Sequence, residues 1–391
     1  MSEQASEAEK TEYGLYFHFP FCLRKCRYCS FFSDRHDNQA EERYFESLLR
    51  ELTEHVPEGL PLRTFYVGGG TPTLLEPSKW KRLREVTDRH LDTSGVIEST
   101  IETNPATSNE LHLGELLEAG FDRLSVGVQS LRDVSLRILG RPHTAQEAVQ
   151  TIRTGRKVGF QRLSFDLIYG IPDQTLEMFR EDLQKAIDIA PEHVSCYELS
   201  LDEGTEMAGL HKVGVVKKPD EDVCKEMYLL AHEMLTSNGY LHYEVSNYAL
   251  GEDNTSVHNF CYWRLSPYHG LGPSAHSFDG NRDRWWNVSD NARYVEMLKQ
   301  GRPPTEERET LTAMQMALEL LMLGLRIKDG VNLREVAAKT GLEITPQGRE
   351  HLEQLRNQGM LTIEEDRIRP TVKGMLFADG MARDLSEHME S

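Results

Sequence analysis

Two periodicities of apolar residues alternate along the first half of the chain. Apolar runs rich in β-branched and aromatic residues predict six strands, and the segments between them have the length of helices. The predicted strands are Tyr13–Phe19, Thr64–Val67, Ile97–Glu102, Arg123–Val128, Arg162–Ile168 and His193–Leu199. The predicted helices are Glu41–His55, Pro77–Leu91, Asn109–Ala119, Ala145–Val158 and Leu176–Ile189. This alternation predicts an α/β fold with a parallel sheet, and six units predict a partial (β/α)6 TIM-like barrel over residues 13–200.

The second half of the chain changes pattern twice. Residues 201–303 begin with a helix at Pro219–Asn238 and an extended stretch at Tyr240–Tyr248, and then gather aromatics, histidines and glycines in what we expect to be a polar, turn-rich region. After a boundary near residues 303–304, the pattern predicts three helices, a hairpin and a last helix. They are Thr310–Leu325, Leu333–Thr340, Thr345–Gln358, the hairpin Gly359–Pro370 and a helix from Thr371. Residues 304–391 therefore predict a small α+β winged-helix-like domain.

Composition and charge narrow the class of protein. Apolar residues make up 39% and charged residues 27%, and no stretch is long enough to span a bilayer. Residues 1–12 lack the features of a secretory signal, so we expect a disordered tail and a cytoplasmic protein. The net charge of −19 argues against a large nucleic-acid footprint and against binding an anionic membrane by charge, which leaves at most peripheral membrane association. A DNA-binding regulator is disfavoured for the same reason.

A cluster of cysteines follows the first predicted strand. Three of the six cysteines, Cys22, Cys26 and Cys29, lie in a CxxxCxxC spacing. An odd number of thiols fits neither a disulfide pair nor a usual zinc site, although structural zinc and buried thiols remain alternatives. Thiolates are the usual ligands of iron–sulfur clusters, so the spacing favours a [4Fe–4S] cluster bound at three irons, with the fourth iron open to a small ligand.

Glycines and polar residues gather where the predicted strands end. Three glycines, Gly68 to Gly70, follow the second strand, and Glu102, Gln129 and Asp166 occupy the ends of the next three. Barrel and open α/β enzymes place their sites at this edge, so these residues predict one mouth lined with hydrogen-bond acceptors. Arg141 would supply a cation for a carboxylate. The alternatives are a tight turn for the glycines, solvated loop side chains for the acceptors and a surface position for the arginine.

Six motifs resemble those of the radical S-adenosylmethionine (SAM) enzymes, specifically the oxygen-independent coproporphyrinogen III oxidase group. They are CxxxCxYC after YFHFPF, then GGGTPT, ETNP, SVGVQS, LGRPHT and DLIYGIP, and the likeness spans roughly residues 13–375. The resemblance implies a [4Fe–4S] cluster on Cys22, Cys26 and Cys29 and SAM on its open iron. It also implies that Gly69, Gly70 and Thr71 contact the SAM amino group, Arg141 its carboxylate, and Gln129 and Asp166 its ribose. Glu102, Tyr16 and Tyr28 complete the expected cofactor site, and no side chain is assigned a catalytic role.

Two differences from the oxidases and one further motif favour a function other than that of the oxidases. The oxidases carry a fourth cysteine two residues after the third, where this chain has Phe31, and a long N-terminal extension, where about a dozen residues precede the first strand here. The stretch His258-Asn-Phe-Cys-Tyr-Trp263 resembles the HNxxYW motif of a branch of haem chaperones. Imidazole is a common axial ligand of haem iron, so we expect His258 to contribute to haem binding. A hydrogen-bonded loop histidine and ligation by Cys261 are the alternatives.

The leading hypothesis is therefore a haem chaperone that retains the cluster and SAM site. It implies haem as cargo and recipient haem proteins, such as respiratory enzymes, as partners, and it allows a haem donor and a homodimer. The alternative is an enzyme on the same core: a coproporphyrinogen III decarboxylase, a radical methyltransferase or a haem-degrading relative.

Overall fold

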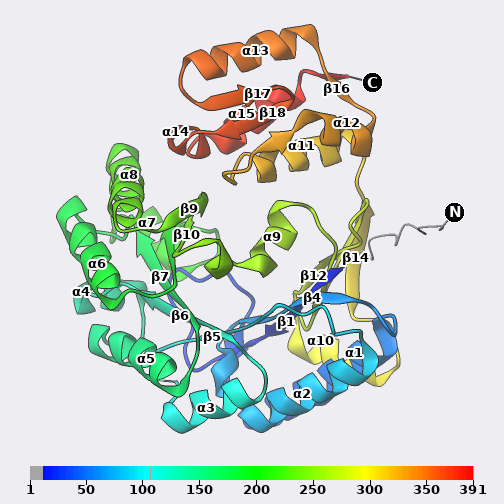
Figure 1. Ribbon diagram of the computed structural model, residues 1–391. Coiled ribbons are helices and arrows are strands. Elements are labelled where there is room, and N and C mark those ends of the chain that lie inside the picture. Colours follow the sequence, from blue (N-terminus) through cyan, green and yellow to red (C-terminus); the bar gives the residue numbers. More distant parts are fainter. Residues whose placement is uncertain (1–11, 106, 391) are drawn as a thin grey trace, which may run out of the picture.

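The computed structural model describes residues 12–105 and 107–390 and is built around one twelve-stranded sheet (Figure 1). Its centre is six parallel strands, which confirm all six strands expected from the sequence. They are β1 (Tyr13–Phe19), β4 (Leu62–Gly69), β5 (Glu98–Thr103), β6 (Arg123–Gln129), β7 (Arg162–Tyr169) and β8 (His193–Glu198). The predicted tail, residues 1–12, lies outside the described residues except for Glu12. Because these strands are parallel, their carboxyl ends form a single mouth.

Helices cover the outer face of these strands and form an arc around them in Figure 1. The five expected helices are confirmed as α1 (Asn38–His55), α2 (Pro77–His90), α3 (Glu110–Glu118), α5 (Ala145–Val158) and α6 (Leu176–Ile189). Two seven-residue helices, α4 (Asp133–Leu139) and α7 (Glu206–Lys212), were not expected. The ends of α5 follow from local chemistry, because Thr144 and Glu147 form a capping box and Gly159 takes a left-handed conformation.

The core lies between the sheet and this layer of helices. Trp80 of α2 is fully buried, its ring lies 6.0 Å from that of Phe19, and its Nε1 donates to the Pro72 carbonyl at 3.0 Å. Phe17 and Phe65, on neighbouring strands, are buried with ring centres 4.9 Å apart. Burying each such side chain stabilises the fold by roughly 2–3 kcal/mol. This packing makes the parallel strands a rigid support for the loops at their carboxyl ends.

Both edges of the sheet are extended by residues from the middle of the chain. Beyond β8 lie β10 (Asn247–Ala249) and β9 (Leu241–Glu244), which follow α8 (Glu221–Ser237). Beyond β1 lie the parallel β11 (Tyr268–Leu271) and then the antiparallel β12 (His276–Phe278), β13 (Asp283–Asn287) and β14 (Thr305–Thr310). The expected helix is confirmed as α8, and the expected extended stretch as β9 and β10. The expectation of a turn-rich region after them is wrong, because β11 to β13 and the helices α9 (Val257–Trp263) and α10 (Asn291–Lys299) occupy most of it. The domain limits at residues 200 and 303 stay predictions.

The last part of the chain forms a second, smaller core. Its elements are α11 (Ala313–Gly324), β15 (Val331–Asn332), α12 (Leu333–Thr340), β16 (Glu343–Ile344), α13 (Pro346–Asn357), β17 (Leu361–Glu364), β18 (Arg367–Pro370), α14 (Val372–Met375), α15 (Ala378–Ser386) and β19 (Met389–Glu390). Leu321, Leu352 and Leu385 lie at its centre, and β17 and β18 form the expected hairpin. Across residues 12–105 and 107–390, no helix combines the length and apolar content that a membrane crossing requires.

Candidate cofactor site

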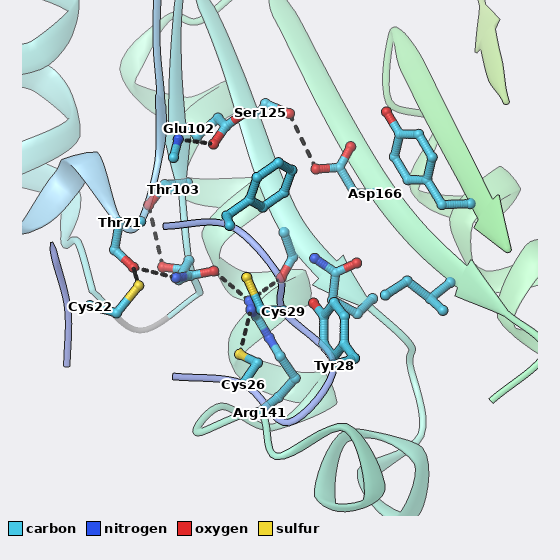
Figure 2. Close-up of a pocket in the computed structure, with 18 of the residues that line it drawn as sticks. Cys22, Cys26, Tyr28, Cys29, Thr71, Glu102, Thr103, Ser125, Arg141 and Asp166 are labelled. Atoms are coloured by element: carbon cyan, nitrogen blue, oxygen red, sulfur yellow. Dashed lines mark hydrogen bonds between the residues drawn. The ribbon is translucent and has the colours of Figure 1, made fainter. Parts of the chain in front are cut away.

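The three cysteines lie in one loop that follows β1. Cys22 ends the short strand β2 (Phe21–Cys22), which pairs with β3 (Asp34–Arg35), and the Cys29 amide donates to the Cys26 carbonyl at 3.3 Å. All three thiols are free, half-buried and line a cavity of about 420 Å³ at the mouth of the strands (Figure 2). Burial raises the pKa of the Cys29 thiol to about 11. A positive charge is therefore needed to hold it as a thiolate at neutral pH, and iron is a group that supplies one.

Two donors point at the sulfurs of this loop. Thr71 Oγ1 donates to Cys22 Sγ at 3.5 Å, and Arg141 Nη1 donates to Cys26 Sγ at 3.3 Å. Such donors stabilise the negative charge of a thiolate-bound cluster. Within the part of the chain that the structure describes, no three His, Cys, Asp or Glu side chains are arranged to hold a single metal ion. A cubane cluster makes a different demand, because each of its three ligand sulfurs binds a different iron. The donor set fits that cluster.

The glycine turn after β4 packs against the cysteine loop. A Cβ on Gly70 would lie 2.3 Å from the Phe21 carbonyl oxygen, and Gly69 has a φ of +107°, with the His18 ring where its Cβ would be. The Gly70 amide donates to Phe19 and the Thr71 amide to Phe21. Gly69, Gly70 and Thr71 all line the cavity. Glycine is therefore required at these two positions by close contact with residues 18–21. The sequence interpretation had instead attributed the glycines to the close approach of a ligand.

Two half-buried carboxyl groups lie in the same mouth. Glu102 accepts from the Tyr66 hydroxyl at 2.7 Å and the Gly69 amide at 3.2 Å, and burial raises its pKa to about 7. Asp166 accepts from Ser195 Oγ at 2.8 Å and Ser125 Oγ at 3.3 Å, and burial raises its pKa as well. Both groups line the cavity, so they can accept hydrogen bonds from the hydroxyl or ammonium groups of a ligand. Tyr66 and the two serines were not expected from the sequence.

Arg141 belongs to a network that reaches the cysteines. Besides Cys26, its guanidinium donates through Nη2 to the Asn104 side chain and the Gly127 carbonyl, while its Nε is buried without a partner among the described residues. Asn104 also donates to Thr71 Oγ1 at 2.6 Å. Two of the residues expected to contact SAM, Arg141 and Thr71, thus donate directly to cysteine sulfurs. Asn104 was missed, although the ETNP motif contains it.

Gln129 and Tyr28 complete the cavity wall. Gln129 ends β6 at an irregularity in the pairing with β7, and its φ of +69° is a strained value for a residue with a side chain. Tyr28 lines the cavity between Cys26 and Cys29, and burial raises the pKa of its hydroxyl. The structure therefore brings the cysteines together with eight of the other predicted residues. They are Tyr28, Gly69, Gly70, Thr71, Glu102, Gln129, Arg141 and Asp166.

The remaining two predicted residues, Tyr16 and His258, lie behind Tyr66 and do not line the cavity. The Tyr16 hydroxyl bonds to His18 Nδ1 at 3.1 Å. His258 is 1% exposed, its ring stacks on Tyr66 at 4.8 Å, and both ring nitrogens are bonded: Nδ1 to Thr64 at 2.7 Å and Nε2 to Tyr262 at 2.8 Å. Burial lowers the pKa of His258 to about 3, so its ring is neutral. In this arrangement His258 offers no nitrogen to iron, and its contribution to haem binding stays a prediction that requires α9 to open.

Comparison with known protein families defines the class to which this site belongs. Residues 16–186 match the family model of the Radical SAM superfamily, and residues 311–377 match the HemN C-terminal domain. Among solved structures, coproporphyrinogen III oxidase (HemN) from Escherichia coli superposes with a TM-score of 0.81 over 96% of this chain and 90% of that chain, at 22% identity. The fold and the cysteine site are therefore those of a radical SAM protein, and this class implies a [4Fe–4S] cluster and SAM.

Curated relatives then define the family within this class. The chain is 33% identical to the heme chaperone HemW of Lactococcus lactis over 92% of this chain and 93% of the relative. It is 31% identical to HemW of Bacillus subtilis, over 93% and 96%, and 30% identical to the mitochondrial radical S-adenosyl methionine domain-containing protein 1 of Danio rerio, over 95% and 86%. The chain belongs to the HemW family of radical SAM proteins.

Proposed function

We propose that this chain is a haem chaperone that binds a [4Fe–4S] cluster, SAM and haem and passes the haem to haem proteins. The observation that carries the proposal is the identity of 31–33% to proteins named as heme chaperones, which extends over more than nine-tenths of the chain. A likeness confined to the cysteine motif would support only cofactor binding. We further propose respiratory enzymes as recipients, a separate haem donor and a homodimer as the working form.

In this proposal, the chain's own residues arrange the cofactors. Cys22, Cys26 and Cys29 would hold the cluster, and Arg141 and Thr71 would stabilise their sulfurs. Glu102, Gln129 and Asp166 would accept hydrogen bonds from SAM, and Tyr28 would cover the cluster and reduce access of water to it. When bound, the cluster supplies an electron for reductive cleavage of SAM. Within the chain, Glu102 is able to hold a proton near neutral pH because of its raised pKa.

One anaerobic experiment tests this function. The reconstituted protein is titrated with haem, with and without SAM, and then mixed with an apo-haem protein while 5′-deoxyadenosine is measured. We expect saturable haem binding and transfer to the acceptor. Failure to bind haem, or binding without any transfer, would contradict the chaperone function.

The same preparation tests the competing enzyme. Phe31, which occupies the position of the fourth cysteine of the oxidases, is 66% exposed and offers no thiol. With a reductant, SAM and coproporphyrinogen III, we therefore expect no stoichiometric formation of vinyl groups. Such formation would replace the chaperone by a decarboxylase.

A further inference from the structure

One histidine lies at the mouth of the strands on the edge formed by β11 to β13. Because β11 runs parallel to β1 and β12 runs back, the first residue of β12, His276, lies at the same end of the sheet as the cysteine loop. Gly14 of β1 pairs with Tyr268 of β11, and Tyr268 pairs with Phe278 of β12, two residues after His276. Directly paired residues, and residues two apart on one strand, point to the same face of a sheet. His276 therefore shares a face with Gly14 and Tyr16, which we call the inner face.

The ring of His276 is exposed, whereas the ring of His258 is buried. His276 is exposed, and its ring makes no hydrogen bond to any residue in 12–105 or 107–390. It stacks on Trp286 of β13, with ring centres 5.6 Å apart and an angle of 24° between the planes. Partial burial and the nearby Arg284 lower the pKa of His276. The imidazole is thus neutral at physiological pH, with a free nitrogen lone pair for a metal.

The backbone on both sides of this pair is held in place. The Asn287 amide donates to the Ala275 carbonyl at 2.9 Å, and the Asn287 side chain donates to Glu51 at 2.6 Å. Glu51, buried in α1, also accepts from the Gly272 amide at 2.8 Å. One buried carboxyl group therefore ties together the loop before His276 and the strand that carries Trp286. This anchoring limits the movement of both rings.

The cysteine loop contributes apolar surface to the same mouth. His18 connects the two regions: a Cβ on Gly272 would lie 2.5 Å from the His18 carbonyl oxygen, and the His18 ring lies 6.3 Å from that of Phe32. On that loop Leu23 and Phe31 are 57% and 66% exposed. Both side chains line the cofactor cavity, so the cysteine loop presents apolar surface at the mouth. A flat apolar ligand with a central metal fits this combination.

We propose that His276 is an axial ligand of the haem iron and that Trp286 orients its imidazole. This assignment rests on the proposed haem chaperone function and names the residue that would bind the haem iron. An axial imidazole stands perpendicular to the porphyrin, so Trp286, which is stacked on the imidazole, meets the porphyrin with its edge and restricts rotation of the ligand. The cargo then lies across the mouth, next to the cluster loop. Trp286 is a positioning residue in this arrangement.

The test compares His276 with a matched histidine on the opposite face. His269 follows the inner-face residue Tyr268 on β11, and its ring lies 5.4 Å from that of Trp285. Haem is titrated into full-length wild type, His276→Gly and His269→Gly, and absorption and low-temperature EPR spectra are recorded. We expect His276→Gly to weaken haem binding at least tenfold and to lose the low-spin imidazole signature. His269→Gly should retain both, and free imidazole should restore the signature to His276→Gly.

These outcomes distinguish a role of His276 as a haem ligand from a purely structural role. An unchanged spectrum in His276→Gly, or a loss that imidazole does not restore, would overturn the assignment while the chaperone function stands. Failure of the wild type to bind haem would overturn the chaperone function itself. Trp286→Leu should keep imidazole ligation but broaden the EPR signal, because the ring is then free to rotate. Loss of ligation in that variant would contradict its positioning role.

Discussion

A buried carboxylate determines whether α9 stays in place. Glu98 begins β5, is fully buried, and accepts from the backbone amides of Val257 at 3.1 Å and His258 at 2.9 Å. These amides belong to the first turn of α9 and have no partner within the helix. A negative charge at this end of a helix is also favourable. Replacing Glu98 with alanine removes both effects at once.

The expected cost follows from these contacts. Hydrogen bonds to a charged group contribute about 1.5–3 kcal/mol each, and removing one partner of a buried ion pair costs about 3–5 kcal/mol. The guanidinium groups of Arg123 and Arg162 lie 3.9 and 3.8 Å from Glu98, but each has a second partner, the Asn254 carbonyl and Asp122 respectively. We therefore expect Glu98→Ala to cost about 3 kcal/mol, at the lower end of the range.

Hydrogen exchange measures this loss where it occurs. If α9 opens locally, 3 kcal/mol corresponds to exchange about 100-fold faster at the amides of residues 257–263. The control is Glu110→Ala, because the Glu110–Lys157 pair is exposed on both sides and should contribute less than about 1 kcal/mol. Glu98→Gln, which keeps an acceptor, should lie between them. Exchange in Glu98→Ala within threefold of the wild type would refute the idea that this carboxylate holds α9.

Three further outcomes are expected. Gly70→Ala should lower the iron content after reconstitution, because its Cβ would meet the Phe21 carbonyl at 2.3 Å and displace the cysteine loop. Cys29→Ala should abolish the cluster absorbance while Cys196→Ala retains it, since Cys196 lies buried in the core away from the loop. Burial raises the pKa of Glu51 from 4.5 to about 7, so the native state binds the extra proton and stability falls as pH rises from 4.5 through 7. Denaturation of the cluster-free chain should show that Glu51→Gln lacks about 3 kcal/mol of this pH dependence; equal slopes in both proteins would contradict it.

The barrel and most of the cofactor site could be predicted because their signals are local. Each central strand combines an apolar run with a polar or glycine residue directly after it, and a parallel sheet brings those ends together regardless of the loops between them. Glu102 and Asp166 could thus be placed in one mouth without knowing any contact. Their partners could not, because Tyr66 and Ser195 were interpreted as ordinary strand residues, and only pairing between strands turns them toward the carboxylates.

The edge strands β11 to β14 were missed for the opposite reason. β11 pairs with β1 across more than 250 residues, as in the pairing of Gly14 with Tyr268. Pairing with so distant a strand cannot be recognised from the four residues of β11, where histidine and glycine replace the β-branched residues of the central strands. The inner face that carries His276 therefore emerges only once the strand order is known.

The two histidines differ in how their rings are held in the folded chain. His258 lies in the distinctive HNxxYW stretch, and its bonds to Thr64 and Tyr262 and its stacking on Tyr66 fix its ring in place, while its contribution to haem binding stays a prediction. Tyr66 in turn donates to Glu102, so we expect a substitution at His258 to disturb the position of Tyr66 and Glu102 in the cofactor cavity. Among residues 12–105 and 107–390 the ring of His276 has no hydrogen-bond partner, and this exposed ring stacks on Trp286. A residue held by bonds on both ring nitrogens is expected to position other groups, whereas a ring with free nitrogens is able to bind iron without breaking any bond. On this reasoning, loss of His258 should affect the cluster and SAM site, and loss of His276 should affect haem ligation.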